Sequence, residues 1–166
     1  MRKLISKLMF ITLSVTFFSS CSNSNESSNT ILPTETNQIT DTKEDDDYMN
    51  KTLVLKIDNQ EVDVSWLEND SVNQLMKLAK DGLTLELHEY GGFEQTGLIR
   101  YTLPSNDSRI DVVPGDIVLY NSNQISIFYN NSSWSYTKLG HINLSDSELK
   151  ELLSSEEHIT ITLTLK

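Results

Sequence analysis

Apolar and polar residues alternate over several short segments in the later two-thirds of the chain. Alternation with a period of two places successive side chains on opposite faces of a β-strand. The segments with this pattern cover residues 52–58, 61–67, 83–88, 117–120, 124–129, 137–142 and 159–165. Asn59-Gln60 between the first two segments suits a short turn, so we expect the domain to open with a β-hairpin.

Two other segments have the spacing of amphipathic helices. The first is predicted to begin with Asp70 or Ser71 as the N-cap and to stop at Gly82. The second begins with a capping box, in which Ser145 is followed three residues later by Glu148. Many short strands and two helices predict a mainly β domain, in which a closed barrel with two short helices has its interior filled by side chains.

The N-terminus has the order of a secretory signal. Arg2, Lys3 and Lys7 are followed by an apolar run over residues 8–18 and then by Ser19-Ser20-Cys21. The apolar run is shorter than the roughly 20 residues that a membrane-spanning helix needs. This pattern predicts a signal peptide over residues 1–20 and therefore a secreted protein.

The small residues before Cys21 resemble the bacterial lipoprotein signal. The resemblance implies that Cys21 becomes the lipidated first residue of the mature chain and carries acyl groups such as palmitate. The protein would then be a membrane-anchored lipoprotein of the cell envelope, on the outer side of the cytoplasmic membrane or in the periplasm. The alternatives are an ordinary signal peptide with a cysteine near its end by chance, or a short uncleaved anchor.

The stretch from 21 to 50 differs in composition from the remainder of the chain. It is rich in Ser, Asn, Thr, Asp and Glu, and such a segment buries too little apolar surface to fold alone. We expect residues 21–50 to be a disordered acidic tether. The acidic run Glu44–Asp47 lacks the Asp-x-Asp-x-Asp-Gly spacing of a calcium loop and is interpreted as a solvated charge run.

Charge and cysteine content limit the possible partners and the means of stabilisation. The 166 residues have a formal charge of −11, and 17 acidic against 9 basic residues leave −8 for the predicted domain over residues 51–166. The basic residues form no stripe, so nucleic acid is excluded as a partner. We separately expect the protein to be a monomer. The single cysteine cannot form an intramolecular disulfide, so stability must come from an apolar core.

Five segments, taken together and in order, resemble the bacterial cyclophilin-like domain family. They are Tyr90–Gly97, Leu103–Asp107, Pro114–Tyr120, Asn123–Tyr129 and Ser133–Ile142. The resemblance implies a closed cyclophilin-like β-barrel, which agrees with the strands and helices predicted above. It does not by itself carry the activity of the true cyclophilins, peptidyl-prolyl cis-trans isomerisation.

A comparison residue by residue makes isomerase activity the alternative function. Gln124 and Trp134 match the true cyclophilins, whereas Ser126 stands where they place the aromatic floor of the proline pocket. The loop after Trp134 is too short for their pocket histidine. Arg100 is the candidate for the catalytic arginine, which acts beside the prolyl carbonyl and nitrogen. If the protein is an isomerase at all, we therefore expect a weak one that uses Arg100.

The preferred function is binding of a peptide segment or small ligand without catalysis. The expected ligand-binding residues are Arg100, Gln124, Phe128, Trp134 and Tyr136. Two alternatives stay open. Trp134 can instead plug one end of the barrel, and Arg100 can simply pair with a carboxylate on the surface.

Metal and cofactor chemistry find no support in the sequence. His88, His141 and His158 are widely spaced and follow none of the patterns that bring metal ligands together, so we expect no metal site. Gly91-Gly92 lacks the strand-to-helix setting of a phosphate-binding loop, and we expect no cofactor. Asp116, in Pro-Gly-Asp, is expected to bond nearby backbone amides in a turn.

Overall fold

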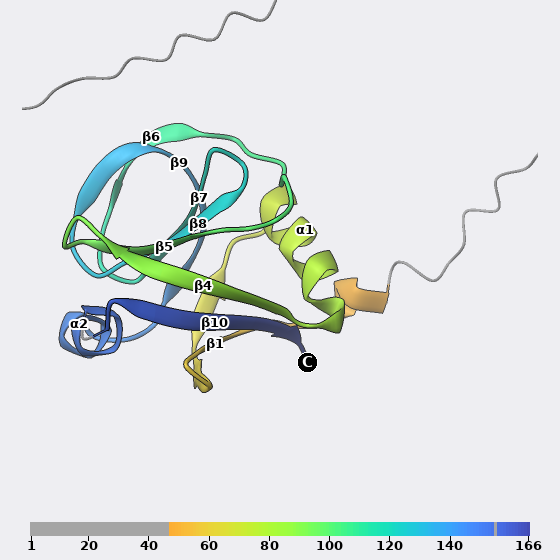
Figure 1. The fold of residues 1–166 in the computed structure, drawn as a ribbon. Helices are drawn as coiled ribbons and strands as arrows, with labels where there is room; N and C mark the ends of the chain where they lie inside the picture. The colour runs from red at the N-terminus through yellow and green to blue at the C-terminus, as the bar shows by residue number, and fades with distance from the viewer. Residues whose placement is uncertain (1–46, 155) are drawn as a thin grey trace, which may run out of the picture. The chain divides into compact units, whose positions relative to one another are not determined.

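The computed structural model describes residues 47–154 and 156–166, which form a mainly β domain (Figure 1). Its strands are β1 (Leu53–Ile57), β2 (Gln60–Val62), β3 (Val64–Trp66), β4 (Leu83–Tyr90), β5 (Glu94–Leu98), β6 (Ser108–Val112), β7 (Asp116–Tyr120), β8 (Gln124–Phe128), β9 (Ser132–Ile142) and β10 (His158–Leu165). The helices are α1 (Asp70–Leu78), α2 (Asp146–Ser154) and two 3-10 helices, η1 (Asp47–Asn50) and η2 (Ala79–Asp81).

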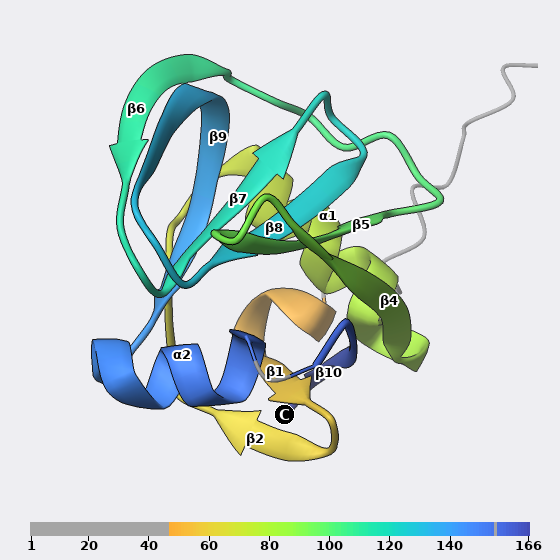
Figure 2. The same ribbon diagram turned by 60° about the vertical axis from the view of Figure 1, so that its left-hand side comes forward.

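The strands form one nearly closed barrel, as predicted. Their order is β2-β1-β10-β4-β5-β8-β7-β9-β3, with β6 paired to β9 outside this path, and the pairs are antiparallel. The indole of Trp66 on β3 donates a hydrogen bond of 2.8 Å to the carbonyl of Leu53 on β1, which brings the two ends of the order together. The β6–β9 arm and α2 lie at opposite ends of the domain (Figure 2).

Two apolar clusters lie on opposite faces of the sheet around β7 and β8. The larger core contains the alternating residues Ile117 and Leu119 on β7, together with Ile125 and Ile127 on β8. Val118 on β7 and Phe128 on β8 point to the opposite face of the sheet, where they pack with Val112 and Tyr136 from the β6–β9 arm. Because both faces are covered, β7 and β8 are buried almost throughout, and the second face becomes the wall of a cleft.

The ends of the two α-helices test the predicted caps. The N-cap of α1 is Asn69, whose side-chain oxygen accepts a hydrogen bond of 2.9 Å from the amide of Val72; the prediction of Asp70 or Ser71 was wrong by one or two residues. The capping box of α2 is confirmed. The amide of Ser145 donates to the Glu148 carboxylate at 2.9 Å, and the amide of Glu148 donates to the Ser145 hydroxyl at 3.4 Å.

Several strands depart from the predicted boundaries. The segment 61–67 is not one strand but two, which are separated at Asp63. Strand β2 pairs with β1, whereas β3 pairs with β9. Strand β9 starts at Ser132, five residues before the predicted segment 137–142. Strands β5 and β6 were not predicted, since neither has an apolar alternation of its own.

The folded part begins before residue 51. Tyr48 in η1, which the sequence placed in the tether, is 5% exposed, and the ammonium of Lys77 on α1 lies 5.6 Å from the centre of its ring. The expected signal peptide, Cys21 and most of the expected tether lie outside the described residues. Within the described ranges, no helix combines the length and apolar character needed to cross a membrane.

Candidate ligand-binding cleft

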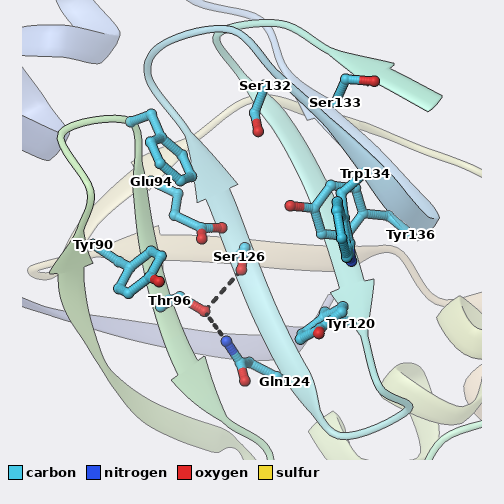
Figure 3. A pocket seen from close by; sticks show the side chains of 11 residues that line it. Tyr90, Glu94, Thr96, Tyr120, Gln124, Ser126, Ser132, Ser133, Trp134 and Tyr136 are labelled. Atoms are coloured by element: carbon cyan, nitrogen blue, oxygen red, sulfur yellow. Dashed lines mark hydrogen bonds between the residues drawn. The ribbon is translucent and has the colours of Figure 1, made fainter. Parts of the chain in front are cut away.

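A cleft of about 500 Å³ opens between the second apolar cluster and strands β4 and β5 (Figure 3). Strands β4, β5, β7, β8 and β9 contribute to it. The lining residues are Tyr90, Phe93, Glu94, Thr96, Tyr120, Gln124, Ser126, Ser132, Ser133, Trp134 and Tyr136. The cleft therefore combines an aromatic wall with a polar floor, which is the usual composition of a small-ligand site.

The floor is a row of polar side chains joined by hydrogen bonds. Thr96 on β5 pairs with Ser126 on β8 in the strand register, and their hydroxyl oxygens lie 2.8 Å apart. The amide nitrogen of Gln124 donates to the Thr96 hydroxyl at 2.8 Å, and that hydroxyl donates to the carbonyl of Ile125 at 3.2 Å. These bonds fix the rotamers of the floor (Figure 3).

The aromatic wall rests on a buried ring. Phe128 is fully buried, stacked with Phe93 at 6.2 Å between ring centres and edge-to-face with Tyr136 at 5.6 Å. Tyr136 meets Tyr120 at 5.9 Å in the same manner. Such pairs hold each ring in place, so the wall is preformed. Trp134 reaches over the cleft from β9 with 54% of its surface exposed.

Among the described residues, Glu94 is the only carboxylate that lines the cleft, and it is almost completely buried at 6% exposure. Its Oε2 atom has no hydrogen-bond partner. Burial raises the pKa of Glu94 above its ordinary value, while the Ser126 hydroxyl beside it acts weakly in the opposite direction. Burial, followed by the negative charge of Glu94, also raises the pKa of Tyr136. The inner end of the cleft thus holds a buried carboxyl group with one oxygen that has no hydrogen-bond partner.

The five residues expected from the sequence fall into three places. Gln124, Trp134 and Tyr136 line the cleft, and Phe128 lies beneath its surface as the support of the wall. Arg100 is exposed and lines a neighbouring groove, which shares Thr96 and Gln124 with the cleft. The alternative in which Trp134 plugs the barrel does not occur, because the ring is half exposed. Arg100 has no ion-pair partner among the described residues, so the surface pair considered for it is not formed there either.

Several lining residues were not singled out from the sequence. Glu94 and Thr96 lie on β5, a strand that the hydrophobic pattern did not reveal. Tyr90, Phe93 and Tyr120 fall within or next to segments of the family resemblance, yet nothing in their spacing marked them as lining one cavity. The signal that could have found them is the concentration of aromatic residues in those segments.

Asp116 has the structural role expected for it. It accepts a hydrogen bond of 3.2 Å from the amide of Val113, and its Oδ1 lies 2.8 Å from both Lys138 Nζ and His141 Nδ1. Burial would raise the pKa of Asp116, but the bonds from Lys138, His141 and Val113 outweigh it, and the pKa lies below its usual value. Asp116 lies outside the cleft and ties β7 to β9.

The other histidines form a pair across two strands. His88 on β4 and His158 on β10 are register partners, with 2.5 Å between their Nδ1 atoms, and both are exposed. No group of three or more His, Cys, Asp or Glu side chains suited to a metal ion occurs in the described part of the chain.

The fold and cleft define a barrel-shaped domain with a preformed ligand-sized site. A family model described as the cyclophilin-like family matches residues 55–164, so the chain belongs to the cyclophilin-like family. Searches among curated proteins and among solved structures found no match. Membership of this family establishes the fold class but does not establish an activity, which depends on the residues of the site.

Proposed function

We propose that the protein is a membrane-anchored lipoprotein whose domain binds a peptide segment or small ligand in the aromatic cleft, without catalysis. The observation that carries the binding function is the cleft itself. Its volume of about 500 Å³ suits a small ligand or one to two amino-acid side chains, and its rings are held by edge-to-face and stacked contacts. A preformed site loses little entropy on binding.

The groups that line the cleft favour binding without catalysis. The lining residues in the described chain include no histidine, cysteine, lysine or arginine, which leaves Glu94 as the one carboxylic acid among tyrosines and neutral side chains. A single buried acid without a second acid, base or nucleophile within the cleft favours recognition over reaction.

The anchoring part of the proposal rests on the N-terminal sequence alone. A signal ending in Ser19-Ser20-Cys21 favours lipidation at Cys21 and placement in the cell envelope. The acidic segment after Cys21 would keep the domain away from an anionic membrane surface, so that the cleft remains accessible.

Ligand binding is tested by screening a peptide and fragment library against the full chain with Trp fluorescence and NMR chemical shifts. We expect bound members to shift the Trp134 signals, and Trp134→Ala to weaken binding by roughly tenfold or more, since stacking on an aromatic ring contributes about 1–2 kcal/mol. Tyr101→Ala is the matched control, because Tyr101 is 55% exposed but lines the neighbouring groove. Binding that survives Trp134→Ala unchanged would place the site elsewhere.

A weak peptidyl-prolyl isomerase activity is the second candidate function, and one observation favours it. Thr96 and Gln124 line both the aromatic cleft and the groove that contains Arg100. A peptide that crossed from the cleft into this groove would pass the arginine. This function requires Arg100 to act on a prolyl bond held beside the cleft rather than within it.

A further inference from the structure

We propose that the ligand of this cleft is an organic cation, with an alkylammonium group held between the aromatic wall and the Glu94 carboxylate. This inference rests on the proposed binding function and specifies the chemistry of its ligand. The alkylammonium group can belong to a free amine or to a lysine side chain.

The burial of Glu94 and its missing hydrogen-bond partner favour a positively charged ligand in the cleft. The residue is 6% exposed, one carboxylate oxygen has no hydrogen-bond partner, and the carboxylate points towards the middle of the cleft (Figure 3). A buried carboxylate is normally paired with a cation or fully hydrogen-bonded. Among the described residues that line the cleft none is basic, so none of them supplies a positive charge to pair with Glu94, and a cationic ligand would supply it.

The aromatic wall favours the same kind of ligand. Tyr90, Tyr120, Trp134 and Tyr136 lie around the space in front of the carboxylate (Figure 3), and Phe93 lines the same cleft. The faces of these rings carry negative quadrupole potential, which attracts ammonium groups and their attached methylenes. Rings on several sides with an acid at the inner end form the arrangement that recognises alkylammonium ions, whereas an anionic ligand would be repelled by both features.

Long-range charge acts in the same direction. The predicted domain carries −8, and none of its described basic residues lines the cleft, although Arg100 lines the neighbouring groove. The overall field of the domain therefore favours the approach of cations and opposes the approach of anions.

The floor explains how the rest of such a ligand is held. Gln124, Ser132 and Ser133 line the cleft together with Glu94. They provide donors and acceptors for an amide or hydroxyl attached to the cationic group. Because these groups also suit a peptide backbone, the source of the ammonium group is decided by experiment.

The test uses matched pairs of probes on the full chain, followed by calorimetry and Trp fluorescence. Choline is compared with its neutral isostere 3,3-dimethyl-1-butanol, and Nα-acetyl-lysine methylamide with Nα-acetyl-norleucine methylamide. We expect at least one cation to bind roughly tenfold or more tightly than its neutral partner, with Trp134 responding. Preference for choline indicates a small free ammonium compound, and preference for the lysine derivative indicates a peptide.

Two variants separate the carboxylate from a general effect of charge. Glu94→Gln is expected to lose roughly tenfold in affinity for the cation and to keep its weak affinity for the neutral probe. Glu68→Gln makes the same change in charge at an exposed position outside the cleft and should leave both affinities unchanged. Circular dichroism confirms that both variants are folded before binding is measured.

The outcomes distinguish this inference from the function on which it rests. If the neutral isosteres bind as tightly as the cations, or Glu94→Gln binds the cation unchanged, the cation inference is overturned while the cleft remains a binding site. If neither cation binds, the inference is overturned and the library screen decides the binding function separately.

Discussion

Glu94 on β5 lies directly opposite Phe128 on β8 in the strand register, so a buried carboxylate is placed next to a fully buried ring. The side chains of this face pack against the β6–β9 arm instead of the main core. An acid in such surroundings loses hydration without gaining a positively charged partner. The arrangement lowers the stability of the domain, and this cost can be measured.

We expect Glu94→Gln to increase the free energy of unfolding at neutral pH by about 1 kcal/mol, because the amide removes a buried unpaired charge. Since burial raises the folded-state pKa of Glu94 above its ordinary value of 4.5, the folded protein holds this proton more tightly than the unfolded chain. The carboxylate therefore destabilises the fold progressively as pH rises from about 4.5 through the folded pKa.

Urea denaturation at several pH values measures this difference. The gain from Glu94→Gln should be present at pH 7 and should disappear below pH 4.5, where the acid is protonated in both states. Glu68→Gln, at an exposed position, serves as the control and should show no such dependence. A Glu94→Gln variant less stable than the parent at pH 7 would mean that the carboxylate is compensated by groups of the protein.

The opposite behaviour is expected for Asp116, which is 1% exposed and fully partnered. Asp116→Asn should lower the free energy of unfolding by about 2–3 kcal/mol, since it removes the charge that Lys138 and His141 contact. Lys138→Met should cost less, about 1 kcal/mol, because Lys138 is partly exposed to solvent.

The pH dependence for Asp116 also has the opposite sign. Its folded pKa lies below the ordinary value of 3.8, so its stabilising effect is complete above about pH 4 and is lost as pH falls through the folded pKa. Thermal unfolding from pH 7 to pH 3 should show the difference between parent and Asp116→Asn shrinking below pH 4. A constant difference over this range would point to packing rather than charge.

Gly97 is required where β5 leaves its ladder with β4. A Cβ atom there would lie 2.3 Å from the carbonyl oxygen of Glu86 and 2.6 Å from Leu87 Cδ2. The backbone oxygen cannot move without separating the strands, so Gly97→Ala should cost about 3 kcal/mol. Because Thr96 is adjacent, the same variant should also displace the cleft floor.

Gly82→Ala provides the comparison. A Cβ at Gly82 meets nothing within 4 Å, and its cost of about 1 kcal/mol comes only from the positive φ of +83°. Chemical denaturation of the two variants, together with the NMR shift of the Thr96 amide, separates steric clash from backbone strain. Equal losses of stability would contradict the close approach of β4 and β5.

Hydrophobic periodicity was sufficient for the elements that have one face in the main core. Strand β10 alternates Ile159, Ile161 and Leu163 into that core and was predicted almost to the residue. Strand β5 was missed because both of its faces carry polar or small residues. Gln95 is buried yet donates to the carbonyl of Leu153 in the last turn of α2 and to that of Glu156 beyond it, a tertiary role that no local pattern contains.

The site was predictable to the extent that aromatic residues mark it. Trp134 and Tyr136 were found because large rings cluster next to a strand with a family resemblance. Glu94 was not found, since burial of an acid depends on the β6–β9 arm folding over it. Arg100 was placed with the others by analogy to true isomerases, whereas in the structure it follows the end of β5 and lines the neighbouring groove.

The position of Arg100 leads to a prediction on catalysis. We expect the full chain not to accelerate cis-trans exchange of Xaa-Pro peptides in an NMR exchange assay. We also expect Arg100→Ala to change ligand affinity in the cleft by less than about twofold, because an exposed charge contributes little. If the chain catalyses the exchange and Arg100→Ala abolishes this activity, the isomerase function is favoured instead. Gln124→Ala would then test whether Gln124, which lines both the cleft and the groove, positions the peptide.

The anchor is tested separately, since it depends on Cys21 and not on the cleft. Acyl chains bind a bilayer with about 0.8 kcal/mol per buried methylene, so two or more chains give stable attachment. Cys21→Ala should move the protein from the membrane fraction to the soluble fraction and abolish incorporation of labelled palmitate. Ser22→Ala keeps the cysteine and should leave both readouts unchanged. If Cys21→Ala stays with the membrane, the attachment comes from the apolar run over residues 8–18, and the N-terminus is an uncleaved anchor rather than a lipoprotein signal.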